Sequence, residues 1–200
     1  MAQVEVRPKH EELFAAAIRL FRERGYHATS MQHLAEAVGI QRGSLYHYIE
    51  AKEDLLWEIM EGAIGRLLAA VEPIARSGGP AADRLRRAVA AHLEVAATLR
   101  DELTILHVEL KSLSPKRRTA MIAYRDRYQD LFRSMVRDGL RGGEFRDVDP
   151  HATVFAILGA CNWFTQWFRP DGRDGYEVFA ASFADLFLQG LHRPSRAVED

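Results

Sequence analysis

Apolar residues recur every three or four positions along almost the whole chain, and this is the spacing of a buried helix face. Gly25 and Gly39 each end a helical apolar pattern, and Pro115 opens a long one. No stretch alternates between apolar and polar residues as a strand would. The pattern predicts an all-α protein of about nine helices: one that ends near Gly25, and others at 31–38, 41–49, 52–75, 81–98, 101–112, 115 to about 140, 150–168 and 174–191.

Ala35, Gly39 and Leu45 have the spacing of a helix-turn-helix. In that motif a small residue lets two helices cross closely, a glycine adopts the positive-φ turn, and a large aliphatic residue closes the small core. The second helix, residues 41–49, then keeps polar and aromatic side chains that the core does not need. Such a helix suits the DNA major groove, although the same spacing occurs in purely structural bundles and exposed aromatics also occur in protein interfaces.

Composition limits the possible classes of protein. The 200 residues are 48% hydrophobic and 28% charged, and the net charge of −1 gives no general attraction to nucleic acid. Residues 1–55 carry seven basic and eight acidic residues, so any DNA contact must come from local placement. The single Cys161 cannot form an internal disulfide, and neither a signal peptide nor an apolar span of roughly 20 residues is visible. We therefore expect a cytoplasmic protein without membrane segment, metal or cofactor, and with frayed ends at residues 1–7 and 193–200.

Residues 28–60, ATSMQHLAEAVGIQRGSLYHYIEAKEDLLWEIM, resemble the DNA-binding headpiece of the TetR family of transcriptional regulators. The resemblance rests on the Thr/Ser start, the small-residue helix, the glycine turn, the GSLYHY recognition helix and the opening of the next helix, and it covers residues 10–60. It implies a three-helix helix-turn-helix domain at residues 8–55 and a helical ligand-binding and dimerisation domain at residues 56–192. It also implies a ligand-responsive regulator, a repressor by family default, that binds palindromic double-stranded operator DNA as a homodimer.

By this resemblance, one set of headpiece residues contacts DNA. Thr29 and Tyr46 are expected to meet phosphates, as is Lys52 at the start of the fourth helix, and the others are expected to read or approach bases. The set is Thr29, Gln32, Gln41, Arg42, Ser44, Tyr46, His47 and Lys52. Many family members have His where this chain has Tyr48, so the ring of Tyr48 is assigned neither to packing nor to contact.

The last two predicted helices each carry an apolar face. Helix-turn-helix proteins bind as dimers because one short helix reads only a few base pairs. Two such helices from each subunit can form a four-helix bundle across a two-fold axis, and the TetR resemblance favours this arrangement. The alternative is that these faces pack into the protein's own core. The expected interface residues are Phe155, Leu158, Phe179, Phe183, Leu186 and Phe187.

Polar or amphipathic residues interrupt the otherwise apolar middle helices: His92, His107, Glu109, Tyr124, Arg125 and Tyr128. An apolar pocket with a few convergent polar groups is the usual form of a small-molecule site. Each of these residues is also compatible with an ordinary core or surface position. Their concentration, combined with the family resemblance, predicts a pocket for a small apolar effector, lined by His92, Tyr124, Arg125 and Tyr128.

The stretch CNWFTQWFRPDGR, residues 161–173, is the most distinctive part of the C-terminal half. It holds two i,i+4 pairs and then two arginines: Trp163 with Trp167, Asn162 with Gln166, and Arg169 with Arg173. The stretch resembles a subset of TetR-type regulators that respond to acyl-coenzyme A thioesters, which implies effector contacts from Asn162, Trp163, Trp167 and Arg169. The alternative places the tryptophans in the dimer interface or the core and leaves the arginines solvated.

The chain has no phosphate-binding glycine loop and no G-x-S-x-G nucleophile elbow, and His107 and Glu109 lack the spacing of a helical zinc motif. An all-helical enzyme or a protein-binding adaptor remains an alternative without a DNA role. The resemblance favours a DNA-binding regulator that is not an enzyme.

Overall fold

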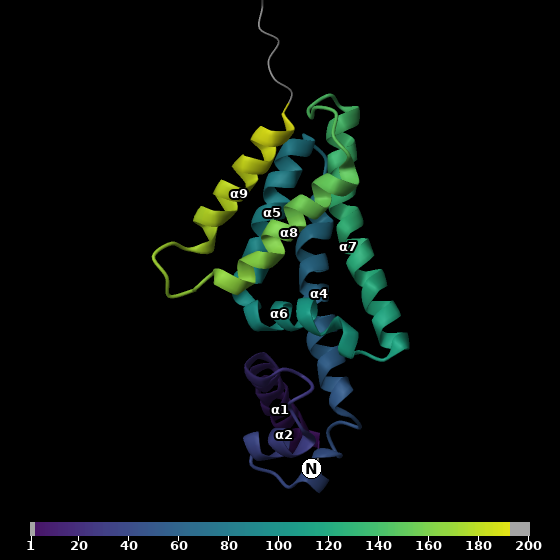
Figure 1. The fold of residues 1–200 in the computed structure, drawn as a ribbon, viewed down its shortest axis with the longest axis vertical. Helices are drawn as coiled ribbons and strands as arrows, with labels where there is room; N and C mark the ends of the chain where they lie inside the picture. The colour runs from purple at the N-terminus through teal and green to yellow at the C-terminus, as the bar shows by residue number, and fades with distance from the viewer. Residues whose placement is uncertain (1–2, 193–200) are drawn as a thin grey trace, which may run out of the picture. The chain divides into compact units, whose positions relative to one another are not determined.

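The computed structural model describes residues 3–192, and within this range it contains nine α-helices, one 3-10 helix and no named strand (Figure 1). The elements are α1 (Gln3–Arg24), α2 (Met31–Ala37), α3 (Arg42–Leu45), α4 (Lys52–Ala75), α5 (Ala81–Thr98), α6 (Arg100–Val108), η1 (Glu109–Ser112), α7 (Pro115–Arg141), α8 (Pro150–Trp167) and α9 (Tyr176–Leu191). The all-α prediction is confirmed. Residues 3–7, expected to be frayed, belong to α1, and residues 193–200 lie outside the described residues. None of the helices within 3–192 is long and apolar enough to cross a membrane.

The recognition helix is shorter than the predicted range of 41–49. Helix α3 comprises only Arg42–Leu45, and the amides of His47 and Tyr48 bond to carbonyl groups three residues earlier. Hydrogen bonds between residues three apart form tight turns and do not extend an α-helix. Gly43, inside α3, further lowers the helix propensity of the segment.

Contacts divide the helices into two compact units. Unit 1 contains the chain up to Ile64 together with Leu99–Ala123, and unit 2 contains Gly65–Thr98 together with the chain from Tyr124 onward. Helices α4 and α7 each begin in unit 1 and end in unit 2. The predicted division into residues 8–55 and 56–192 differs from this grouping, because α6, η1 and the start of α7 pack with the headpiece.

A small core holds α1, α2 and α3 together in unit 1. Ala35 and Leu45 are completely buried, and Gly39 has a φ of 67° in the turn between α2 and α3. These observations confirm the three roles predicted for the helix-turn-helix. Ser30 caps α2: its hydroxyl accepts from the amide of His33, and the ring of His33 accepts from the amide of Ser30.

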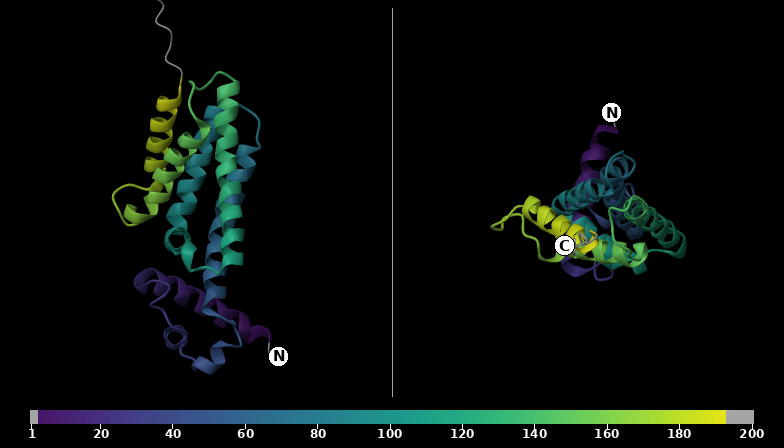
Figure 2. Two further views of the ribbon diagram at one scale, coloured as in Figure 1. Left: turned by 45° about the vertical axis from the view of Figure 1, so that its right-hand side comes forward. Right: turned by 90° about the horizontal axis from the view of Figure 1, so that it is seen from above.

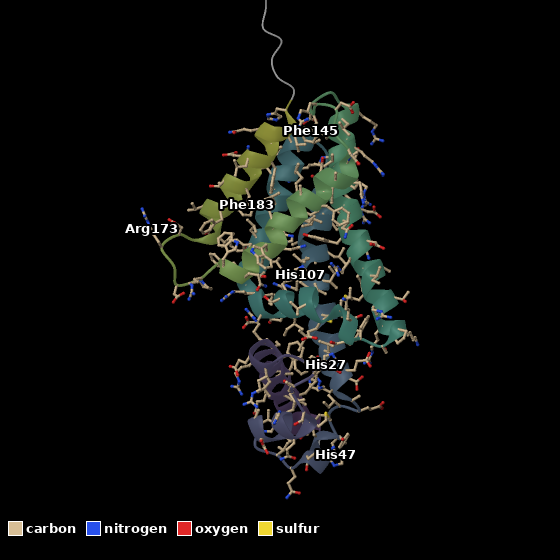
Figure 3. The ribbon with its side chains drawn as sticks, in the orientation of Figure 1. His27, His47, His107, Phe145, Arg173 and Phe183 are labelled. Carbon is tan, nitrogen blue, oxygen red and sulfur yellow. The ribbon has the colours of Figure 1, made fainter. Side chains whose placement is uncertain are left out.

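In unit 2, α5 packs against α8 and α9, and α9 lies alongside α5 in the views of Figures 1 and 2. The guanidinium of Arg84, at the start of α5, donates to the carbonyl of Ala75 and to the carboxylate of Asp138. Phe145, labelled in Figure 3, is completely buried against Gly139, where a Cβ would approach its ring to 2.2 Å. These contacts fasten the ends of α4, α5 and α7 to one another.

Candidate DNA-binding surface and candidate effector site

The outer side of α2, α3 and the turn after α3 presents hydrogen-bonding side chains. Six of the eight predicted DNA-contact residues lie there, all exposed except the half-buried Ser44: Gln32, Gln41, Arg42, Ser44, Tyr46 and His47. Figure 3 shows the side chain of His47 pointing away from the headpiece helices. Guanidinium, amide and imidazole groups can reach base edges in the major groove, and the half-exposed Tyr46 can present its hydroxyl to a phosphate.

Thr29 has a different place from the predicted one. Its side chain is completely buried, and its hydroxyl donates to the carbonyl oxygens of Leu20 at 3.2 Å and Gly25 at 2.9 Å. These bonds tie the loop after α1 to the end of that helix. The prediction that the Thr29 side chain contacts a phosphate is therefore wrong, because the hydroxyl is enclosed by the headpiece core.

Lys52 also turns inward, but its side chain is only half-buried, so the phosphate contact expected of it stays a prediction. Its ammonium donates to the carbonyl oxygens of Tyr26 at 2.7 Å and Thr29 at 2.5 Å, and it lies 4.2 Å from the centre of the Tyr26 ring. Burial lowers the pKa of Lys52, while the negative charge of Glu109 raises it. Lys52 thus fastens the α1–α2 loop to the start of α4.

Replacing Lys52 with Met should destabilise the headpiece, because it keeps the aliphatic stem but leaves two backbone carbonyls without their charged donor. We expect the free energy of unfolding to fall by about 1–3 kcal/mol in urea denaturation followed by circular dichroism. Lys111→Met, at an exposed position of η1, is the matched control. Unchanged stability combined with weaker binding to every DNA sequence would favour the phosphate-contact interpretation.

A second set of contacts reaches the α1–α2 loop from η1. The amide of Tyr26 donates to Oε1 of Glu109 at 3.1 Å, and the hydroxyl of Ser112 donates to Oε2 of Glu109 at 2.6 Å. Nε2 of His27, labelled in Figure 3, lies 3.0 Å from the same Ser112 hydroxyl. The loop is therefore held by polar contacts from both α4 and η1.

The start of α7 contacts the start of α4 within the same unit. The guanidinium of Arg117 donates to the carboxylate of Asp54 at 2.6 Å and lies 3.7 Å from Glu53, which accepts from the amide of Ser114. Asp54 also accepts from the amide of Ala51 and so caps α4. Burial alone would raise the pKa of the Asp54 carboxyl, but the hydrogen bonds from Arg117 and Ala51 outweigh it and lower that pKa.

Two predicted effector residues meet in the interior of unit 2. The hydroxyl of Tyr128, on α7, lies 2.8 Å from Nδ1 of His92, on α5, and both side chains are buried. Burial raises the pKa of Tyr128 well above its ordinary value, and nearby Cys161 raises it further. Burial also raises the pKa of the Cys161 thiol to about 12. Tyr124 and Arg125, on the same helix, are half-buried.

The tryptophans of α8 do not join this buried pair. Trp163 is 66% exposed and Trp167 is 42% exposed, and the Trp167 ring packs edge-on against Phe179 with 5.2 Å between centroids. The Trp167 ring thus contacts predicted interface residues of α9, and the effector contact expected of the two tryptophans stays a prediction. Asn162 is half-buried on α8, and Arg169 is exposed in the loop between α8 and α9. Figure 3 shows Arg173, in the same loop, pointing away from the helices.

Helices α8 and α9 carry a set of exposed or half-buried large apolar side chains, which we call the α8–α9 apolar surface. It consists of Phe155, Trp163, Trp167, Phe179, Phe183, Leu186 and Phe187. Leu186 is 66% exposed and Phe155 51% exposed, whereas the predicted interface residue Leu158 is buried. Leu158 lies on the inner face of α8 with Val154 and Cys161, so its assignment to the interface is wrong. Soluble monomers seldom expose an apolar patch of this kind.

Comparison with known proteins decides the family. Residues 13–59 match the family model described as bacterial regulatory proteins, tetR family, and residues 78–191 match the tetracyclin repressor-like C-terminal domain. The chain belongs to the TetR family.

Individual TetR-family proteins resemble this chain over most of its length. The transcriptional repressor KstR2 of Rhodococcus jostii is 30% identical over 93% of this chain and 92% of its own. The structure of PfmR from Thermus thermophilus has 38% identity and a TM-score of 0.82, over 90% of this chain and 99% of PfmR. AibR, solved in complex with isovaleryl coenzyme A and operator DNA, has 29% identity and a TM-score of 0.79, over 94% and 100%. This TetR-family chain is a transcriptional regulator and not an enzyme, as predicted.

The contacts that η1 and α7 make with the TetR headpiece are not predicted by the sequence pattern. The pattern of polar residues in the middle helices groups Glu109 with the effector pocket, whereas the structure places it against the α1–α2 loop. Its partner Tyr26 is 83 residues away in the chain. No local spacing connects residues so far apart, so no sequence signal pairs Glu109 with Tyr26.

Proposed function

We propose that this TetR-family regulator is a homodimeric repressor that binds a palindromic operator through α3 and is released by an acyl-coenzyme A thioester. One observation carries the DNA half of the proposal: the donors on α3 and the following turn are exposed above a buried helix-turn-helix core. In a dimer, the two α3 helices would enter successive major grooves about 34–36 Å apart. A palindromic operator follows from the two-fold symmetry of such a dimer.

The α8–α9 apolar surface supports the homodimer. Two copies of an α8–α9 pair can form a four-helix bundle, in which the rings exposed on one chain are covered by the other. Gly159 lies on the exposed side of α8 and allows close approach of a partner helix. The same patch on each subunit then meets itself, as a two-fold interface requires.

The effector half of the proposal concerns unit 2. The neutral Tyr128 hydroxyl and the His92 ring form a polar pair in an apolar interior, and such a pair can hydrogen-bond to the carbonyl of an apolar ligand. AibR, solved with isovaleryl coenzyme A, supports the thioester class. Arg169 is exposed and can approach the phosphates of the coenzyme.

Acyl-coenzyme A thioesters should release operator DNA, whereas free fatty acids and coenzyme A alone should not. The operator is first selected from random DNA, and release is followed by fluorescence anisotropy with isovaleryl-, octanoyl- and palmitoyl-coenzyme A. Arg169→Ala should raise the thioester concentration for half-release about tenfold, because a charge-assisted hydrogen bond to phosphate is lost. Arg137→Ala, an exposed arginine of α7, is the control.

Three results would count against this proposal in different ways. Release by an apolar compound without any thioester effect would remove the coenzyme part and leave a generic apolar-ligand sensor. An equal response of Arg169→Ala and wild type would remove the role of that arginine. Failure to select any operator would overturn the DNA half.

A further inference from the structure

The loop between α1 and α2, residues 25–30, is held by two oppositely charged side chains of unit 1. Lys52 binds the carbonyl oxygens of Tyr26 and Thr29, and Glu109 binds the amide of Tyr26. The loop ends at Ser30, the N-cap of α2. Its conformation therefore sets where α2 begins, and α3 follows α2 after a short turn.

These two charged residues come from different parts of the chain. Lys52 opens α4, which follows the helix-turn-helix directly, whereas Glu109 opens η1 between α6 and α7. Helix α7 begins in unit 1 and continues into unit 2, where it carries Tyr128 of the candidate effector site. Glu109 thus connects the loop to the segment of chain that leads to that site.

The same segment makes further contacts with the helix-turn-helix. Ser112 donates to the second oxygen of Glu109 and bonds to His27, so Glu109 is oriented by a neighbour that also holds the loop. Arg117 holds Asp54, the residue that caps α4. Residues 109–117 therefore contact both the loop before α2 and the first turn of α4.

We propose that Glu109 is a positioning residue for DNA reading, and that its withdrawal from the Tyr26 amide is the step by which a bound effector loosens the helix-turn-helix. This inference rests on the proposed function, because it needs a DNA-bound and a released form. An effector can shift such an equilibrium only by binding the two forms with different affinity. A 3-10 segment suits the step, because its hydrogen bonds have poorer geometry than those of an α-helix and are more easily rearranged.

The test compares Glu109→Ala, Glu109→Gln and the exposed control Lys111→Ala in the full chain. Glu109→Ala removes the acceptor and should weaken operator binding about tenfold, as expected for a hydrogen bond to a charged group. Glu109→Gln keeps an acceptor oxygen for the Tyr26 amide and should stay within about threefold of wild type. Lys111→Ala should bind as wild type does. Circular dichroism verifies that each variant is folded.

Two further readouts separate positioning from a merely structural role. Hydrogen exchange of the peptide that contains Tyr26 should be faster in Glu109→Ala, and in wild type it should become faster when palmitoyl-coenzyme A is added. The factor by which palmitoyl-coenzyme A weakens operator binding should fall toward one in Glu109→Ala. The contact that the thioester is proposed to break is already missing in this variant.

The proposal is overturned if folded Glu109→Ala binds operator as tightly as wild type. It is also overturned if Glu109→Ala binds weakly but palmitoyl-coenzyme A still releases it by the wild-type factor, because Glu109 is then only structural. If no thioester releases operator DNA from the wild-type protein, the proposed effector is wrong. The positioning role of Glu109 is then decided by the operator affinities of the three variants alone.

Discussion

Leu186→Glu should convert the proposed dimer into a folded monomer that no longer binds its operator. Leu186 is 66% exposed in the single chain and lies on α9 beside Phe183 and Phe187, so it is available to a partner subunit. In a two-fold interface, Leu186→Glu would bury two like charges near the axis. The expected cost is roughly 3 kcal/mol or more, which corresponds to over a hundredfold in the dimer dissociation constant.

Analytical ultracentrifugation and anisotropy with the selected operator measure the two consequences of Leu186→Glu. The control is Ala181→Glu, which adds the same charge to the same helix beside the cleft between α5 and α9. That variant should remain dimeric and bind DNA. A Leu186→Glu protein that stays dimeric would place the interface elsewhere, and one that unfolds would contradict the prediction of a folded monomer.

Replacing Arg42 should change the sequence preference of DNA binding, whereas replacing Tyr46 should change the affinity for all DNA. Both are exposed on or next to α3, but a guanidinium can make a bidentate contact to guanine, whereas a phenol hydroxyl suits a phosphate. Arg42→Ala should therefore reduce the preference for operator over random DNA by about 1–3 kcal/mol. Tyr46→Phe should weaken binding to operator and random DNA by the same factor, because phosphate contacts carry no sequence information.

Anisotropy titrations with operator and with random duplexes of equal length measure both effects at a fixed salt concentration. Gln32→Ala tests whether α2 contributes, since its exposed amide already donates to Glu36 at 2.7 Å on the same helix. Loss of discrimination by Tyr46→Phe, or uniform weakening by Arg42→Ala, would reverse the two assignments. Wild-type binding by both variants would remove α3 from the DNA interface.

The local features of the headpiece could be predicted because each depends on residues close together in the chain. Gly39 occupies the left-handed turn that its position predicted, and Ser30, from the Thr/Ser start, caps α2. Helical periodicity also identified the apolar faces of α8 and α9. Periodicity could not tell which of these residues face a partner and which face the core, because both helices are apolar on several sides. Phe155 is exposed and Leu158 is buried, although both were assigned to the interface.

The charged side chains of unit 1 could not be placed from the sequence, because their partners are backbone groups of distant segments. Lys52 and Thr29 carry polar groups that a headpiece could equally direct to a phosphate. Only the folded loop shows that they donate to backbone carbonyl oxygens. The same holds for Glu109, whose acceptor role depends on the approach of η1 to Tyr26. Family resemblance transfers a residue's position in the motif, but not the direction of its side chain.

The enclosed position of Cys161 makes the protein convenient for site-specific labelling. Burial raises the pKa of this thiol to about 12, so it is protonated at pH 7, and the buried sulfur is out of reach of maleimides. The sequence contains no other cysteine, so a second one introduced at an exposed site would be the only thiol to react. A fluorophore at Glu50→Cys, in the exposed turn after α3, would therefore report operator docking in an otherwise native background.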